Sequence, residues 1–120
     1  MSTLRVTTIT TPSGGQPTIE GLARAWVNFN GTGTVAIRAS LNVSSITDNG
    51  TGQYTVNFIT AMPDDNYCVV SELSDPSSAN PTNGMSTLLY STSTTSLRIH
   101  CGVQSTGYYD TPKAHLAIFR

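Results

Sequence analysis

Charged residues are scarce in this sequence, and their scarcity excludes several classes of function. Asp, Glu, Lys and Arg together make up 11% of the 120 residues, whereas roughly 25% is typical of soluble domains. The net charge is −1, and no cluster of Lys or Arg forms a stripe. Nucleic-acid binding and polybasic attachment to a membrane both depend on such clusters, so we expect neither.

Long apolar runs are also missing. No segment approaches the roughly 20 apolar residues that a membrane-spanning helix needs. The segment Met1–Arg5 lacks the apolar stretch of a signal peptide. We therefore expect no membrane insertion and a chain that is made as a soluble product.

Cysteine is rare, and its placement indicates neither a zinc site nor a disulfide scaffold. The two cysteines, Cys68 and Cys101, fall inside expected strands. They lack the paired spacing of zinc ligands and the density of a secreted disulfide-rich domain. A buried free cysteine behaves as a small apolar side chain. We expect two reduced core residues, and a cross-strand disulfide is the alternative.

Recognisable catalytic motifs are absent as well. No nucleophile elbow, phosphate-binding loop or zinc-binding spacing surrounds the carboxylates and possible bases, which are Asp64, Asp65, Asp75, Asp110, His100 and His115. A threefold assembly could gather one histidine from each copy around a metal, but single histidines on strands are more often hydrogen-bonded groups. We expect no enzymatic activity, no metal and no cofactor.

The most regular feature of the sequence is an alternation of apolar and polar residues between Thr34 and Phe58. On both sides of a break at Asp48–Gly52, apolar side chains stand at every second position, namely Val35, Ile37, Ala39, Leu41, Val43, Tyr54, Val56 and Phe58. This period of two is typical of strands with one buried face. Because Asn-Gly favours a tight turn, the segment is predicted to form a β-hairpin.

Similar runs recur along the chain, separated by turns rich in Gly, Pro, Asn and Asp. The expected strands span residues 22–30, 33–46, 53–60, 66–73, 86–91, 95–103 and 113–120. About seven short strands without a helical period indicate an all-β fold, an antiparallel β-sandwich. A chain of this length holds one core, so residues 22–120 are expected to form a single domain.

Residues 1–21 differ from the rest of the chain. Leu4, Val6 and Ile9 stand among threonines, and Thr11–Pro17 then interrupts any regular element. A lone extended segment cannot bury its apolar side chains by itself, so we expect it to lie against another surface, either this domain, a second copy or a larger assembly. We interpret it as an extended N-terminal attachment arm, with Leu4, Val6 and Ile9 as docking contacts.

Two connections between the expected strands are longer than a hairpin needs. One runs from Ser74 to Gly84 and contains Asn80 and Asn83, and the other runs from Gln104 to Pro112. The second loop combines a tyrosine pair with a carboxylate, a combination suited to stacking on sugars and to protein contact. The candidate receptor-binding residues are Tyr108, Tyr109, Asp110, Asn80 and Asn83. The alternative is that the tyrosine rings cover the end of the sandwich.

Trp26 is a candidate for a contact between subunits. The alternation of Ala25, Val27 and Phe29 places Trp26 on the opposite face of its strand. Large apolar groups on an outer face tend to mark interfaces. We therefore expect Trp26 to lie in an oligomer contact.

The stretch from residue 23 to residue 70 carries a resemblance to a known family. Its matching segments are Ala25–Gly33, Arg38–Ser40, Asn42–Gly52, Tyr54–Phe58, Ala61–Asp64 and Tyr67. Together they resemble the C-terminal domain of bacteriophage tail fibre proteins, especially those of marine and cyanobacterial phages. The end of the chain, Ala114–Arg120, and its leader, Thr3–Ile9 with Ser13–Gly15, are similar to the ends of such fibres.

This resemblance implies a protein of the virion tail. It also implies a homotrimer whose amino end docks to the tail or baseplate and whose carboxyl domain recognises a receptor, a glycan or a protein, on the host cell surface. The sequence departs from long fibres because it has no coiled-coil heptads and no shaft repeats.

A looser similarity concerns lectins. The strand pattern of Tyr54–Phe58, Pro63–Val70 and Ser96–Ile99 is similar to that of H-type lectins, which are trimeric sugar-binding sandwiches. This similarity favours a glycan as the receptor. Two other functions stay open, namely a purely structural virion component, such as a baseplate or capsid decoration protein, and an enzyme that cleaves surface polysaccharide.

Overall fold

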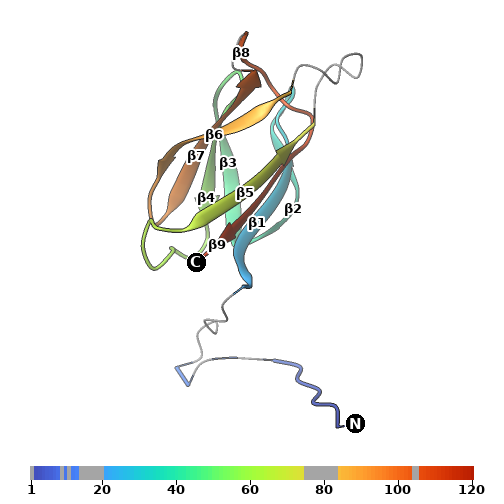
Figure 1. Ribbon diagram of the computed structural model, residues 1–120, viewed down its shortest axis with the longest axis vertical. Coiled ribbons are helices and arrows are strands. Elements are labelled where there is room, and N and C mark those ends of the chain that lie inside the picture. Colours follow the sequence, from blue (N-terminus) through green and yellow to red (C-terminus); the bar gives the residue numbers. More distant parts are fainter. Residues whose placement is uncertain (1, 9, 11, 14–20, 75–83, 104–105) are drawn as a thin grey trace.

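The computed structural model describes residues 2–8, 10, 12–13, 21–74, 84–103 and 106–120. Within these residues the chain forms nine β-strands and no helix (Figure 1). The strands are β1 (Ala23–Asn30), β2 (Ala36–Leu41), β3 (Val43–Gly50), β4 (Gln53–Phe58), β5 (Cys68–Leu73), β6 (Ser86–Thr92), β7 (Ser96–Val103), β8 (Gly107–Tyr108) and β9 (Ala114–Phe119).

The strands form two antiparallel sheets that pack against each other. Sheet A has the strand order β2-β1-β9-β5, and sheet B has the order β3-β4-β7-β6, with β8 paired to β7. The predicted all-β antiparallel sandwich is therefore confirmed. The described residues contain nine strands rather than about seven, because one expected strand is divided and β8 lies inside an expected loop.

The single strand expected over residues 33–46 is wrong, because the chain changes sheets at Asn42. Asn42 has a positive φ of 56°, a left-handed conformation that Asn tolerates better than most residues. Its side chain accepts a hydrogen bond from the Thr60 amide (2.7 Å) and donates one to the Thr60 carbonyl (3.1 Å). The break leaves β2 in sheet A and β3 in sheet B.

The alternation of β2 is also interrupted, by a β-bulge opposite Asn28 and Phe29. Ile37 pairs with the buried Phe29, but Ala39 pairs with Asn28 and Leu41 with Trp26, on the outer side. An extra residue in one strand reverses which side chains face the core. The expectation that Ala39 and Leu41 are buried is therefore wrong, and both are exposed.

The β-hairpin predicted around Asp48–Gly52 is confirmed. β3 and β4 pair antiparallel, with Ile46 opposite Val56. The turn depends on two glycines with positive φ, Gly50 at 127° and Gly52 at 65°. The Asn49 side chain donates a 2.7 Å hydrogen bond to the Thr55 hydroxyl and so fixes the turn against β4.

The core lies between the two sheets. Its buried apolar side chains come from both inner faces and from the loop after β4, namely Ala25, Val27, Phe29, Val43, Tyr54, Val56, Phe58, Met62, Tyr67, Leu97, Ile99, Cys101, Ala114, Leu116 and Ile118. Phe29 of sheet A meets Tyr54 of sheet B edge to face, with ring centroids 5.2 Å apart. Aromatic pairs of this geometry add to the stability that burial provides.

Both cysteines are free thiols, as expected, but only one belongs to the core. Cys101 is buried on β7, and Cys68 is exposed on β5. Cys68 pairs with Phe119 at the outer side of sheet A, because the alternation of β5 turns its side chain away from sheet B. The expectation of a buried Cys68 is therefore wrong.

The N-terminal arm extends from one end of the sandwich, and β8 lies at the other end (Figure 1). In the described part of the arm, Leu4 and Val6 are exposed, Leu4 to 87%. Ile9 lies outside the described residues. The described residues include no helix that is long and apolar enough to cross a membrane.

Candidate functional site

The outer face of sheet B carries polar side chains along its length and aromatic rings at one end. His100 of β7 lies between Gln53 of β4 and Leu88 of β6 in the strand register. Because side chains alternate along a strand, Thr55, Asn57 and Arg98 share this outer face. The inner face of the same strands consists of buried apolar side chains.

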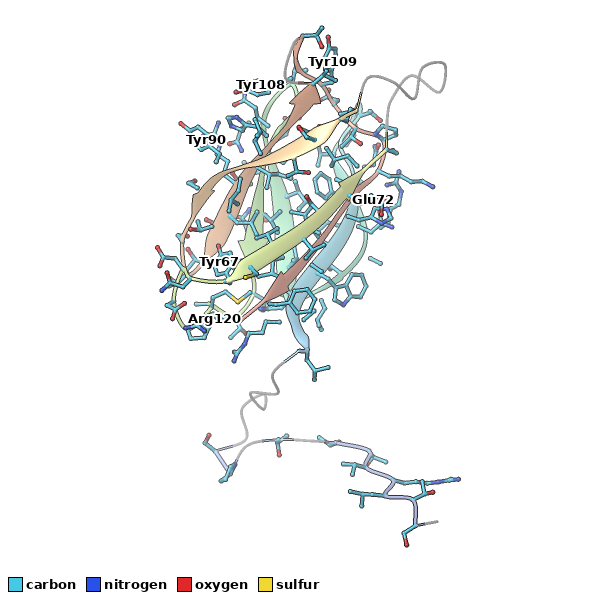
Figure 2. All side chains as sticks on the ribbon, viewed as in Figure 1. Tyr67, Glu72, Tyr90, Tyr108, Tyr109 and Arg120 are labelled. Atoms are coloured by element: carbon cyan, nitrogen blue, oxygen red, sulfur yellow. The ribbon has the colours of Figure 1, made fainter. Side chains whose placement is uncertain are left out.

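Three rings gather at the end of this face, and we call Tyr90, His100 and Tyr108 the aromatic surface. Tyr90 stacks on His100 with centroids 4.5 Å apart and planes 22° apart. Tyr108 meets His100 edge to face at 4.7 Å and 68°. Tyr90 is 62% exposed and Tyr108 is 46% exposed, so both present ring surface to solvent (Figure 2).

Tyr90 reaches this face because of a second β-bulge. Leu89 pairs with Ile99 and Ser91 pairs with Arg98, which leaves Tyr90 as the additional residue of β6. A bulge redirects the side chain that it inserts. Tyr90 consequently lies beside both His100 and Arg98 on the outer side of the sheet.

His100 lies beneath the two tyrosines. It is only 6% exposed, and its Nε2 atom is buried without a hydrogen-bond partner among the described residues. Burial, and secondarily the positive charge of Arg98, lower the pKa of His100 below its ordinary value of 6.5. His100 is therefore neutral at pH 7, and its Nε2 is a buried polar atom without a partner among the described residues.

Arg98 provides a positive charge beside the rings. Its Nη2 donates a 2.9 Å hydrogen bond to Gln53 Oε1, and its guanidinium carbon lies 4.9 Å from the centroid of Tyr90. Stacking on an aromatic face and a hydrogen bond to a neutral amide fix the guanidinium without neutralising it. Within the described part of the chain the one ion pair joins Arg120 to Asp64, so Arg98 has no carboxylate partner there.

The position of Tyr108 depends on a close approach between β8 and β7. Gly102 pairs with Tyr108, and a Cβ atom on Gly102 would lie 3.0 Å from Tyr108 Cα and closer still to the Gly107 carbonyl oxygen. Only glycine allows this approach. Beside the pair is a groove of about 400 Å³, lined by Ser86, Leu88, Gly102, Val103, Gly107 and Tyr108.

Asp110 supports this end of the sandwich from inside. Its Oδ1 accepts a 2.8 Å hydrogen bond from the Gly52 amide and lies 2.8 Å from the hydroxyl of Tyr54. The same hydroxyl lies 2.8 Å from the Gly31 carbonyl oxygen. Burial and the neighbouring Asp110 carboxylate raise the pKa of Tyr54, so the hydroxyl stays protonated.

The receptor-binding candidates predicted from the sequence differ in where their side chains point. Tyr108 and Tyr109 are exposed at the end of the sandwich opposite the arm (Figure 2), whereas Asp110 Oδ1 is turned inward to Gly52 and Tyr54. Asn80 and Asn83 lie outside the described residues. A contact between Asp110 and a receptor stays a prediction, and its observed contacts are structural.

Sequence reasoning missed Tyr90, Arg98 and Gln53 as site residues and considered His100 only as a catalytic base or a metal ligand. The one available signal was that Arg98 and His100 alternate with the apolar Leu97, Ile99 and Cys101 along β7, which places both on the outer face. The bulge at Tyr90 and the pairing of β8 are not visible in the pattern.

The outer face of sheet A carries a second exposed surface. Trp26, Ala117 and Val70 stand opposite one another across β1, β9 and β5, and Leu41 continues the row on β2. We call these residues the apolar row; Trp26 is 38% exposed and lies on the face predicted for it. A groove of about 500 Å³ runs beside the row, lined by Trp26, Val27, Asn28, Val70, Ser71, Glu72, His115, Leu116 and Ala117.

No group of three or more His, Cys, Asp and Glu side chains among the described residues is arranged to hold a metal ion. In comparisons with known proteins, no protein-family model, curated protein or solved structure matched the chain. The functional argument therefore depends on the two surfaces described above.

Proposed function

We propose that this chain is a receptor-binding protein of a bacteriophage virion, of the tail fibre kind, and that it binds a host surface glycan without enzymatic activity. The observation that carries the proposal is the aromatic surface, where Tyr90 and Tyr108 present exposed rings on both sides of the buried His100. The resemblance of residues 23–70 to tail fibre domains supplies the virion context.

The chemistry of this surface suits a sugar. The C–H groups on one side of a pyranose ring pack against a tyrosine face, and tyrosine loses little conformational entropy when it does so. Gln53, Arg98 and His100 Nε2 supply hydrogen-bonding groups beside the rings. A site built from two exposed rings and a few hydrogen-bonding groups binds weakly by itself, and three copies on one fibre would raise the overall affinity through avidity.

The shape of the molecule supports the arrangement that the resemblance implies, in which one end docks to the virion and the other end binds the receptor. The arm and the aromatic surface lie at opposite ends of the sandwich (Figures 1 and 2). In the proposed homotrimer, Leu4, Val6 and Ile9 dock the arm to the tail or baseplate, and Trp26 lies between subunits. The aromatic surface and the loops near it then face the host.

Binding to an array of bacterial surface saccharides tests this function. We expect the wild-type protein to bind a subset of the array and Tyr90→Ala to lose that binding. Tyr90→Phe, which keeps the ring, should retain most of it. Leu89→Ala is the matched control. Leu89 is exposed on the same strand, but it pairs with Ile99 and so lies on the opposite face from the aromatic surface. Equal binding by wild type and Tyr90→Ala would contradict the proposal.

A second candidate function is a purely structural virion component, such as a baseplate or decoration protein. The apolar row on sheet A and the exposed arm favour it, because both are surfaces that burial against a partner would stabilise. Deletion of residues 2–18 distinguishes the two functions. Loss of virion incorporation is expected for both, but cell binding that persists in the truncated protein supports only the receptor-binding function.

A further inference from the structure

We infer that the glycan bound by the aromatic surface is acidic, and that Arg98 binds a carboxylate on a sugar ring stacked against Tyr90 or Tyr108. This inference rests on the proposed function and adds the class of ligand to it. It commits to uronic acids and related carboxylate-bearing sugars in preference to neutral hexoses.

The first argument is the charge of the face. The outward side chains of β4 and β7 around the aromatic surface are Gln53, Thr55, Asn57, Arg98 and His100, of which only Arg98 is charged at pH 7. Arg98 has no ion-pair partner within the described chain. A lone cation among neutral hydrogen-bonding groups attracts an anionic ligand and has no internal carboxylate that such a ligand must displace.

The second argument is the fixed position of the guanidinium. One N–H of Arg98 is used by Gln53 at 2.9 Å, and the planar group is held 4.9 Å from the Tyr90 centroid. Its buried Nε has no partner among the described residues. Because guanidinium carries five N–H donors and binds a carboxylate through two parallel hydrogen bonds, this arrangement leaves unused donors beside an exposed ring.

The third argument is the buried nitrogen of His100. Its Nε2 lies under the two tyrosines with no partner in the described chain, although the imidazole is only 6% exposed. Buried polar atoms normally have hydrogen-bond partners, so we take this unpaired nitrogen beside two exposed rings as a contact for the ligand. A neutral imidazole pairs with a hydroxyl, and a uronic acid offers ring hydroxyls next to its carboxylate.

The experiment compares acidic oligosaccharides with their carboxyl-reduced forms, in which each carboxylate has become a primary alcohol. Affinities of the wild-type protein are measured by isothermal titration with oligogalacturonate, oligoglucuronate and oligosialate, and with the reduced counterparts. We expect at least one acidic form to bind about tenfold to a hundredfold more tightly than its reduced form. Its binding should weaken as salt is added.

Variants of Arg98 assign the effect to this residue. Arg98→Gln should remove the preference for the acidic form, and Arg98→Lys should retain part of it, because lysine keeps the charge but not the paired donors. Arg24→Gln, on the other sheet, is the matched control and should behave as wild type, because the Arg24 side chain contacts the Arg120 carbonyl and not the loop that carries the tyrosines. If Arg98→Gln fails to fold, the comparison of acidic and reduced sugars on the wild type still tests the class of ligand, and Arg98→Lys tests the role of Arg98.

The outcomes separate the inference from the function on which it rests. Saccharide binding that is equal for acidic and reduced forms overturns the inference and leaves the proposed function standing. Binding that prefers acidic sugars but persists in Arg98→Gln overturns the role of Arg98. Failure of the wild-type protein to bind any saccharide of either set, or any on the array, overturns both.

Discussion

Tyr54 connects the two sheets beside the aromatic surface. Its ring packs edge to face on Phe29, and its hydroxyl lies within hydrogen-bonding distance of both Asp110 and Gly31. Gly31 must be glycine at this point, because a Cβ atom there would overlap the Tyr54 hydroxyl. Three chain segments are thus fixed by one buried polar atom.

Tyr54→Phe is therefore expected to destabilise the protein. Removal of the hydroxyl takes away the buried donor that lies 2.8 Å from both Gly31 O and Asp110 Oδ1, and the loss of such a buried hydrogen bond costs about 1–3 kcal/mol. Urea denaturation measures the change in the free energy of unfolding. The matched control is Tyr109→Phe, whose exposed hydroxyl makes only a 3.4 Å contact with the Thr106 carbonyl and should change stability little. A Tyr54→Phe variant as stable as this control would contradict the account.

The protonation of His100 gives a second prediction at the residue scale. The pKa of His100 in the folded protein lies below the ordinary value of 6.5, mainly because of burial. As the pH falls below 6.5, the unfolded chain therefore binds more protons than the folded chain. The free energy of unfolding consequently decreases as the pH falls. Urea denaturation between pH 7 and 5 should show this loss, and His100→Gln should show less of it.

The control for this titration is His115→Gln, because His115 is exposed on β9. The ion pair between Asp64 and Arg120 affects stability in a lower pH range. It lowers the pKa of Asp64 from 3.8 to about 2, so its contribution to stability is lost as the pH falls through that interval. An unchanged dependence in His100→Gln would contradict the burial of a neutral imidazole.

At the scale of elements, β8 determines where Tyr108 stands. The two residues of β8 pair with Gly102 and Val103 of β7, and the Tyr109 amide donates a 3.0 Å hydrogen bond to the Cys101 carbonyl. Gly52 on the hairpin turn touches the same segment, since a Cβ atom there would lie 2.7 Å from the Tyr109 nitrogen. The turn and β7 together fix the loop that carries the tyrosines.

Gly102→Ala is expected to displace β8. It should lower the affinity for saccharide strongly while lowering the unfolding temperature only slightly. The added methyl group cannot fit against the backbone of Gly107 and Tyr108, so Tyr108 moves away from His100. The measurement is the affinity for an array-selected saccharide together with thermal unfolding. Gly84→Ala is the control, because a Cβ atom at Gly84 meets nothing within 4 Å. Wild-type affinity in Gly102→Ala would exclude Tyr108 from the site.

The elements show how far the sequence could be interpreted. Alternation and turn residues predicted the sandwich and the β3–β4 hairpin, because both depend on local patterns. They did not predict the divided strand at Asn42 or the reversal at Ala39, because a left-handed residue and a bulge interrupt the period. The aromatic surface combines rings from β6, β7 and β8, and only the strand register brings them together.

At the scale of the whole molecule, the two exposed surfaces suggest two kinds of contact. The apolar row of sheet A lies across four strands, Leu41, Trp26, Ala117 and Val70, and the aromatic surface lies on the opposite sheet. In a fibre-like assembly the first surface and the arm would be buried between copies or against the tail. The second would remain open to the host.

The expected assembly is a homotrimer, and Trp26 is expected to stabilise it. Light scattering after size exclusion should give a mass near three chains for the wild type and a smaller mass for Trp26→Ala at the same concentration. Ile59→Ala is the control, because Ile59 is an exposed apolar side chain outside the row. A stable wild-type monomer would contradict the trimer and would favour the structural virion component over the receptor-binding protein.

The location of the bound saccharide tests the central claim most directly. A heteronuclear NMR titration of the isotopically labelled protein with an array-selected oligosaccharide reports which side chains sense the ligand. We expect the largest shifts at the rings of Tyr90, His100 and Tyr108, with little change at Trp26. Shifts that gather around Trp26 and the groove of sheet A, with the aromatic surface unaffected, would contradict the account.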